Sequence, residues 1–340
     1  MCDNVGMPSI SDSISRALND NRVSIREMKQ LLTEAKSQPL TKELKNDLQK
    51  LLDLHADKFG VTAKRDLEGW LRSANVIAPP PTPRDLADPT LLTKHTTDTT
   101  WKPVDGGQLY VDGISYDDVV QGSIANCYMV GAFSAVAQQN PDAIKNAIKD
   151  NGDGTYTVSF FENQGYGRAF KQVSVTVDGD MATSASGTQR YGKSREKSEL
   201  WVGVLEKAYA EWKGGYETIG NGGYATEVLE ALTGNRASAT STTATSTDAL
   251  FSRIERASSS GAPITAGTHG KDSGVDYNGT GVYAWHVYTV LGTSQENGAK
   301  YVELRNPWGN TEPGNDGKND GIFKMKMEDF VKLYSHVHFG

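Results

Sequence analysis

The stretch Gln-Gly-Ser-Ile-Ala-Asn-Cys-Tyr-Met-Val-Gly, residues 121–131, contains one of the two cysteines in the 340-residue chain. An apolar run over 128–137 follows Cys127 and stops before Asn140 and Pro141. Proline disfavours helical geometry in the residue before it, so this pattern predicts a helix that begins near Cys127 and ends near Asn140. A thiol at a helix N-terminus has a lowered pKa and is a better nucleophile. The alternative is a small buried hydrophobe, which is the commoner role of a lone cysteine in an apolar segment.

Two later segments supply partners for a nucleophile. His286 lies in the β-type run Ala-Trp-His-Val-Tyr-Thr-Val over 284–290, and Asn306 ends the next such run. A cysteine nucleophile needs a base, and the base needs a third group that fixes its ring. The cysteine and histidine are about 160 residues apart, comparable to the long gap of papain-type proteases. We therefore predict Cys127 as nucleophile, His286 as general base and acid, and Asn306 as the group that orients the imidazole.

Several segments resemble the catalytic core of calpain-type cysteine proteases, in the same order along the chain. They are Gln121-Gly122, Leu200-Trp201, Leu205-Glu206-Lys207-Ala208-Tyr209-Ala210, Leu232-Thr233-Gly234, Arg305-Asn306-Pro307-Trp308-Gly309, Asp320-Gly321-Ile322-Phe323 and Asp329-Phe330. The resemblance covers about residues 100–340 and implies an α+β, papain-like core of two subdomains with the catalytic cleft between them. It also implies a minimal core without the C-terminal calpain domains.

The resemblance assigns two further side chains to the cleft. Gln121 is expected to donate its amide to the developing oxyanion, together with the Cys127 backbone amide. Trp308 is expected either to cover the His286 and Asn306 pair from water or to be an ordinary core tryptophan. Two positions depart from the family pattern: Asn126 and Tyr128 stand where calpains carry an aspartate and a tryptophan.

Calcium is the metal that the resemblance implies, although the acyl-transfer chemistry requires no cofactor. Oxygen ligands suit this ion, and the first site is expected to use the carbonyls of Val111 and Gly113 and the carboxylates of Asp118 and Glu206. At the second site Glu312 and Asp320 match, but Ile322 replaces a carboxylate, so we expect no ion there. The alternative for these acids is that they are solvated loop residues.

Composition shifts predict the domain organisation. Residues 1–78 are expected to form a small N-terminal helical domain, in which Ser24-Ile25-Arg26-Glu27 is a capping box. Residues 79–100 are rich in proline and threonine and are expected to be a linker. The first protease subdomain, with the cysteine, is placed at 101–218, and the second, with the histidine and asparagine, at 219–340. The Ala/Ser/Thr tract over 237–247 is expected to be a mobile surface loop.

Composition also limits the partners. The net charge of −7 and the pI near 5.5 argue against nucleic acid. The sequence shows no apolar run long enough for a membrane span and no signal peptide. With two cysteines there is no disulfide framework. We expect protein substrates, a cytoplasmic location or export by a route without a classical signal peptide, and an N-terminal domain that binds the core or a partner protein.

The function predicted from the sequence is that of a cysteine endopeptidase making limited cuts in flexible protein segments. One alternative is another thiol acyl-transfer enzyme, such as a deamidase or a transglutaminase-like enzyme, which uses the same nucleophile and base. The other alternative is an inactive binding scaffold. The presence of Cys127, His286, Asn306 and Gln121 together argues against the inactive scaffold.

Overall fold

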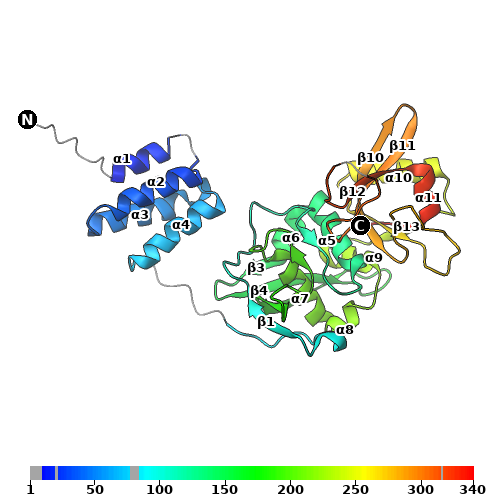
Figure 1. The fold of residues 1–340 in the computed structure, drawn as a ribbon, viewed down its shortest axis with the longest axis horizontal. Helices are drawn as coiled ribbons and strands as arrows, with labels where there is room; N and C mark the ends of the chain where they lie inside the picture. The colour runs from blue at the N-terminus through cyan, green and yellow to red at the C-terminus, as the bar shows by residue number, and fades with distance from the viewer. Residues whose placement is uncertain (1–9, 20–21, 77–83, 315–316) are drawn as a thin grey trace, which may run out of the picture. The chain divides into compact units, whose positions relative to one another are not determined.

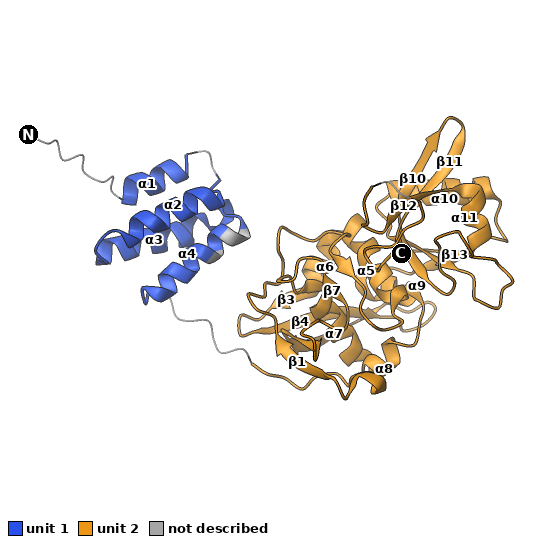
Figure 2. Ribbon diagram, viewed as in Figure 1, with its two compact units in different colours: residues 1–81 blue, residues 82–340 orange. Residues whose placement is uncertain are grey.

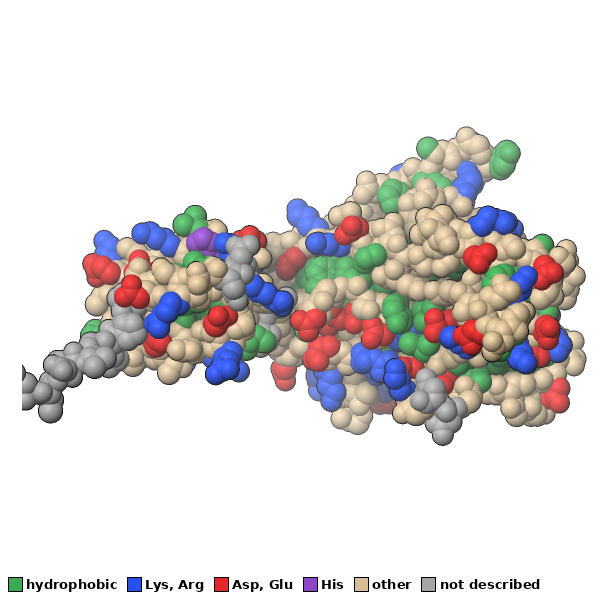
Figure 3. Space-filling view, turned by 90° about the horizontal axis from the view of Figure 1, so that it is seen from above, with side chains coloured by type: hydrophobic (Ala, Val, Ile, Leu, Met, Phe, Trp, Pro, Cys, Tyr) green, Lys and Arg blue, Asp and Glu red, His purple; other side chains and the backbone are tan. Residues whose placement is uncertain are grey.

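The computed structural model describes residues 10–19, 22–76, 84–314 and 317–340. Contacts divide the chain into two compact units, residues 1–81 and 82–340 (Figure 2). The proline-rich part of the expected linker, 79–83, lies outside the described residues. None of the helices in the described ranges has the length and apolar character needed to cross a membrane. Acidic and basic side chains are interspersed over the face seen in Figure 3.

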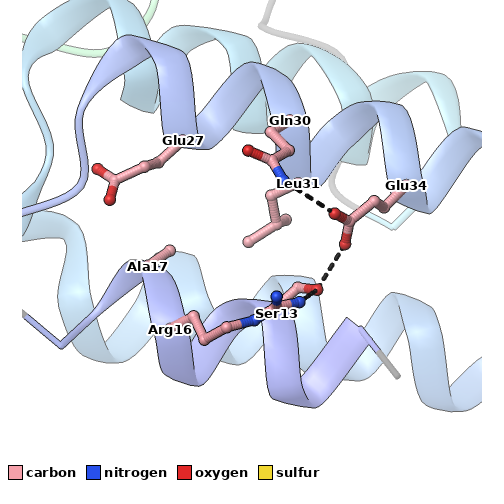
Figure 4. Close-up of a pocket in the computed structure, with 7 residues that line it drawn as sticks. All are labelled: Ser13, Arg16, Ala17, Glu27, Gln30, Leu31 and Glu34. Atoms are coloured by element: carbon pink, nitrogen blue, oxygen red, sulfur yellow. Dashed lines mark hydrogen bonds between the residues drawn. The ribbon is translucent and has the colours of Figure 1, made fainter. Parts of the chain in front are cut away.

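The smaller unit is a helical bundle (Figure 1). Its helices are α1 (Ile10–Ala17), α2 (Ile25–Lys36), α3 (Lys42–His55) and α4 (Val61–Ser73), with a 3₁₀ turn, η1 (Ala56–Lys58). The predicted capping box is confirmed, because Ser24 and Glu27 exchange side-chain and backbone hydrogen bonds at the start of α2. Buried leucines such as Leu31, Leu48 and Leu67 form a core of its own for this unit. Figure 4 shows a small pocket between α1 and α2, with Glu27 and Glu34 at its edge.

The first half of the larger unit is built around the apolar helix that follows the cysteine. Residues 127–137 are all buried in α5, because the run is apolar on every side. A three-stranded antiparallel sheet, in the order β3-β4-β5, lies in the same half. The elements here are η2 (Thr93–His95), β1 (Thr99–Pro103), β2 (Val119–Val120), α5 (Cys127–Gln139), α6 (Pro141–Ala147), β3 (Ile148–Asp150), β4 (Thr155–Glu162), β5 (Lys171–Asp178), β6 (Asp180–Ser184), β7 (Lys193–Ser194), α7 (Trp201–Lys213), α8 (Tyr216–Ile219) and α9 (Ala225–Thr233).

The second half of the larger unit is a six-stranded antiparallel sheet in the order β12-β11-β10-β9-β13-β8. Its apolar face packs with α10 and α11 around a second hydrophobic core (Figure 1). The elements are β8 (Ser238–Ser241), α10 (Thr247–Ser259), β9 (Ile264–Thr268), β10 (Val287–Glu296), β11 (Ala299–Arg305), β12 (Ile322–Lys326), α11 (Met327–Leu333) and β13 (Tyr334–Phe339). The expected α+β architecture is confirmed: the larger unit has two hydrophobic cores, and the N-terminal unit is helical.

Two expectations about boundaries need correction. The division between the halves does not fall at 218, because Val228 and Leu229 of α9 are buried in the first core. The tract 237–247 is not wholly a mobile loop, because Ser238–Ser241 forms β8 and pairs with β13. Small polar side chains do not prevent a strand from forming when a neighbouring edge offers backbone hydrogen bonds.

The described part of the expected linker, residues 84–100, is also not a spacer. The Leu86 amide donates to Asp178 Oδ2 at 2.6 Å. Asp88 pairs with the Lys207 ammonium at 2.6 Å, and the Lys207 side chain is 1% exposed. The segment therefore lies as a strap on the first half of the larger unit, held by ion pairs and backbone hydrogen bonds that its Pro and Thr content does not reveal.

Candidate active site

Cys127 is the first residue of α5, as predicted, and is 9% exposed. Burial raises the pKa of its thiol above the ordinary value, and the nearby amides of Val287 and Tyr128 offset this effect only in part. The expectation of a lowered thiol pKa is therefore wrong for this conformation. The helix N-terminus favours the thiolate, but removal of water from the sulfur has the larger effect on its pKa.

His286 lies just before β10, and Asn306 just after β11, the strand paired with β10. This pairing brings the two residues together, and His286 Nε2 is 2.9 Å from Asn306 Oδ1. Asn306 is fully buried; its Nδ2 donates to the Thr311 carbonyl at 2.8 Å, and its Oδ1 accepts from the Trp308 amide at 3.2 Å. These bonds hold the carboxamide so that its oxygen faces the imidazole.

Burial lowers the pKa of His286 to about 4, and the hydrogen bond with Asn306 opposes this shift. The imidazole is therefore neutral near pH 7. With Nε2 engaged by Asn306, Nδ1 is the ring nitrogen that remains for the thiol proton. A neutral imidazole is the form that can accept that proton.

Trp308 lies against this pair, with its ring centroid 4.8 Å from that of His286. Tyr283 lies 4.6 Å from Trp308 on the same side. Of the two roles expected for Trp308, the one that covers the histidine fits its position, since the indole is half-buried and contacts the imidazole.

One cleft has Gln121, Cys127, His286 and Trp308 together in its lining. The described residues include no hydrogen bond from the Cys127 sulfur to the His286 ring. In enzymes without bound substrate such bonds are often long and tighten only when the substrate binds. The predicted nucleophile and the predicted base thus line one cleft, without a hydrogen bond between them among the described residues.

Gln121 lies beside the cysteine, but its side chain is already engaged. Its Nε2 donates to the Ile124 carbonyl at 2.7 Å, and its Oε1 is buried without a hydrogen-bond partner. An amide nitrogen carries two hydrogens, so one remains for an oxyanion. The Gln121 backbone amide donates to the Pro307 carbonyl at 2.8 Å, which ties this residue to the Asn306 loop.

Buried polar contacts join the two halves next to the site. The fully buried Arg305 donates through Nη2 to the carbonyls of Asp117 and Val119, at 3.1 and 2.7 Å. Thr289 Oγ1 donates to the Gly131 carbonyl of α5 at 2.8 Å. The helix that begins at Cys127 and the strands next to His286 are thus joined by buried and partly buried hydrogen bonds.

The first expected calcium site is only partly assembled as predicted. Glu206 is wrong as a ligand: it is 1% exposed, and its two oxygens accept from the Gly192 amide at 2.8 Å and from Asn126 Nδ2 at 2.7 Å. Burial raises the pKa of Glu206 to about 7. Glu206 instead accepts a hydrogen bond from Asn126, the residue before the cysteine. This bond explains how the fold accommodates an asparagine where calpains carry an aspartate.

Glu199 is the carboxylate that lies with the other expected ligands. Its Oε1 accepts from the Val111 amide at 2.7 Å, and its Oε2 is buried without a hydrogen-bond partner. Burial, with the nearby Asp118 charge, raises the pKa of Glu199 to about 7. Asp112 and Gly113 have φ values of +59° and +106°, which turn the backbone in the loop between the two ligand positions. The neighbouring carboxylates of Asp118 and Glu199, with one Glu199 oxygen that has no hydrogen-bond partner, are suitable ligands for a divalent cation.

The acids of the second expected calcium site are used within their loop. Glu312 Oε2 accepts from the Gly321 amide at 2.7 Å, and Asp320 Oδ1 accepts from the Ile322 amide at 3.0 Å. Both acids are thus hydrogen-bonded to backbone amides of the loop in which Ile322 replaces a carboxylate. The absence of an ion there stays a prediction.

Comparison with known proteins places these residues in a family. Residues 80–315 match the family described as calpain family cysteine protease. Calpain-type cysteine protease DEK1 of Zea mays is 29% identical over 232 residues, which is 64% of this chain and 10% of that protein. Calpain clp-4 of Caenorhabditis elegans is 27% identical over 301 residues, 83% of this chain and 40% of that protein. The calpain-2 catalytic subunit of Mus musculus is 27% identical over 265 residues, 68% of this chain and 36% of that protein. The chain thus spans two fifths or less of the length of these relatives.

Proposed function

Because the chain belongs to the calpain family of cysteine proteases, we propose that it is an endopeptidase in which Cys127, His286 and Asn306 act as one catalytic unit. The observation that carries the proposal is the 2.9 Å contact between His286 Nε2 and Asn306 Oδ1, in a cleft that Cys127 also lines. A histidine fixed at one nitrogen, beside a thiol at a helix N-terminus, has the arrangement that acyl transfer requires.

In the acylation step, the Cys127 sulfur attacks the carbonyl carbon of the scissile peptide bond. The thiol proton passes to His286 Nδ1, which then protonates the leaving amine as the C–N bond breaks. The buried pair starts neutral, since burial raises the pKa of the thiol and lowers that of the imidazole. Substrate binding must therefore bring sulfur and Nδ1 into contact, so that proton transfer and attack occur together.

The oxyanion formed in this step needs donors. The Cys127 backbone amide, at the free N-terminus of α5, is one. The second amide hydrogen of Gln121 is the other. Each such donor contributes typically ~3 kcal/mol to lowering the barrier. In deacylation His286 activates a water molecule, which releases the second product and regenerates the thiol.

The first calcium site, if loaded, would be held by the carboxylates of Asp118 and Glu199 with carbonyl oxygens of the 111–113 loop. A bound ion would neutralise the two carboxylates and fix this loop in the half that carries Cys127. The proposed steps at Cys127 and His286 do not involve the ion.

The test is hydrolysis of casein by the full chain, compared with Cys127→Ala and His286→Ala. We expect peptide release by wild type and loss of release in both variants, with melting temperatures within a few degrees of wild type. Release of ammonia from glutamine side chains without peptide release would instead identify a deamidase. If the folded protein retains its thiol but shows neither activity, the inactive scaffold is favoured.

The helical unit over 1–81 is proposed to regulate or target the protease unit. It forms a core of its own. The covalent link to the strap would keep the helical unit at a high effective concentration near the protease unit. Cleavage between the two units would release the helical unit.

A further inference from the structure

Trp285, the residue before the proposed base, has a backbone conformation that is costly for its side chain. Its φ is +56°, in the left-handed region that favours glycine. Bulky residues there are outliers, whereas Asn and Asp, such as Asn297 and Asp112 in this chain, are common. Strain of this kind persists only where the surrounding structure fixes the backbone, and it gathers at functional sites.

The surrounding hydrogen bonds do fix this backbone. The Trp285 amide donates to the His269 carbonyl at 3.0 Å. Thr268 Oγ1 accepts from the His286 amide at 2.9 Å and donates to the Tyr283 carbonyl at 2.8 Å. The strained residue is therefore held between two anchored neighbours.

Packing of the indole within the chain does not compensate for this strain. Trp285 is 67% exposed, so most of its apolar surface is left in water. One edge rests on Gly270, where a Cβ would lie 2.0 Å from Trp285 Nε1. Gly270 thus leaves room for the indole, and the opposite face stays open.

That open indole lines the same cleft as Cys127 and His286. Tyr283 and Trp308 line it too, on the side of the histidine, whereas the facing segment 121–125 is uncharged. Lys271 is the one Lys, Arg, Asp or Glu among the lining residues. The surface next to the nucleophile is thus aromatic with a single positive charge, which suits an apolar side chain and disfavours a basic one.

We propose that Trp285 is a specificity-determining residue, whose exposed indole stacks against an aromatic or large aliphatic side chain next to the scissile bond of the substrate. The inference rests on the proposed function and names the substrate class of that site. Aromatic pairs prefer offset or edge-to-face contact, and an exposed indole beside the cleft offers both. Gly270 is then a positioning residue, because it permits the indole to lie where it does.

Binding is tested first, because it does not depend on cleavage. Binding of labelled peptides to the Cys127→Ala variant is measured by fluorescence anisotropy. The peptides carry Phe or Ala on either side of the bond that wild type cuts. If wild type cuts none, Phe or Ala is placed at each position in turn of one peptide of fixed length. We expect the Phe peptide to bind about tenfold more tightly, which is the lower end of what a pocket discriminates. The ratio should fall to about one when Trp285→Gly is added. Equal binding of both peptides before that change, or a ratio that survives it, overturns the proposal.

Cleavage provides the second readout. The ratio of kcat/KM for the Phe peptide to that for the Ala peptide should fall about tenfold in Trp285→Gly, and in the same direction in Gly270→Ala, where the new methyl group displaces the indole. The control is Tyr166→Gly, which removes an aromatic residue that is 99% exposed and absent from the cleft lining. Its ratio should match that of wild type.

Folding is not expected to obscure the result. Glycine adopts positive φ without strain, so the melting temperature of Trp285→Gly should equal or exceed that of wild type. If no peptide is cut but the binding ratio depends on Trp285, the proposed catalysis fails and the binding inference stands. If peptides are cut with the same preference in Trp285→Gly, the inference fails and the proposed function stands.

Discussion

Replacing Asn306 by alanine removes three hydrogen bonds at once from a fully buried position. They join it to His286 Nε2 at 2.9 Å, to the Trp308 amide at 3.2 Å and to the Thr311 carbonyl at 2.8 Å. Each buried group left without a partner costs about 1–3 kcal/mol, and the three are neighbours whose effects overlap. We expect the free energy of unfolding to fall by about 2–4 kcal/mol. The loss of kcat/KM should stay within the factor of about 10²–10⁴ that a positioned acid–base group supplies.

The measurements are urea unfolding and hydrolysis of a fluorogenic peptide. Asn310→Ala is the matched control, since Asn310 is exposed in the same loop and should change stability by less than about 0.5 kcal/mol. Asn306→Asp keeps an acceptor for the imidazole but loses the donor to Thr311, so its rate should lie between those of wild type and the alanine variant. A folded Asn306→Ala variant with the rate of wild type would refute the orienting role of this residue.

Three further predictions concern the thiol, the buried lysine and the N-terminal unit. Because burial raises the pKa of Cys127, its rate of alkylation by iodoacetamide should rise about tenfold per pH unit between pH 6 and 8; a rate that is flat from pH 5 to 8 would instead indicate a thiolate and imidazolium pair. Lys207→Met should lower the free energy of unfolding of the larger unit by about 3–5 kcal/mol at pH 8, because Asp88, Asp178 and Asp180 lose their cation. Urea unfolding should show a smaller loss at pH 5, since burial already raises the pKa of Asp180 to about 7 and protonated carboxyls need no cation; an equal loss at both pH values would contradict this explanation. A chain that begins at residue 82, and so keeps the strap, should cleave casein faster than the full chain if the helical unit inhibits, whereas an equal rate would exclude inhibition.

Local sequence signals predicted the parts of the fold and the site that depend on neighbouring residues. The start of α5 at Cys127 followed from an apolar run that ends before Asn140 and Pro141, and α2 from its capping box. The contact between His286 and Asn306 was also within reach, because His286 lies in one β-type run and Asn306 ends the next. Strands that follow one another along a chain commonly pair.

The sequence alone could not predict which charged side chains are buried or which distant segments pair. Glu206 was expected as a calcium ligand, and only the fold shows that it is enclosed by Asn126 and Gly192, whereas Glu199 lies next to Val111. The pKa of Cys127 moves up rather than down for the same reason, since desolvation depends on segments distant in the chain. The strand β8 forms from small polar residues because the edge of β13 is free to pair with it. Trp285 could have been noticed only as a large residue beside the histidine, since its φ is a property of the folded loop.

In the proposed mechanism Cys127 is the nucleophile and His286 activates it. The most direct measurement is covalent labelling of the full chain with a peptide epoxide, followed by mass mapping of the adduct, with and without calcium. We expect a single adduct on Cys127 that is lost in Cys127→Ala and strongly slowed in His286→Ala. An adduct on another residue, or labelling of Cys127 at the same rate in His286→Ala, would contradict it.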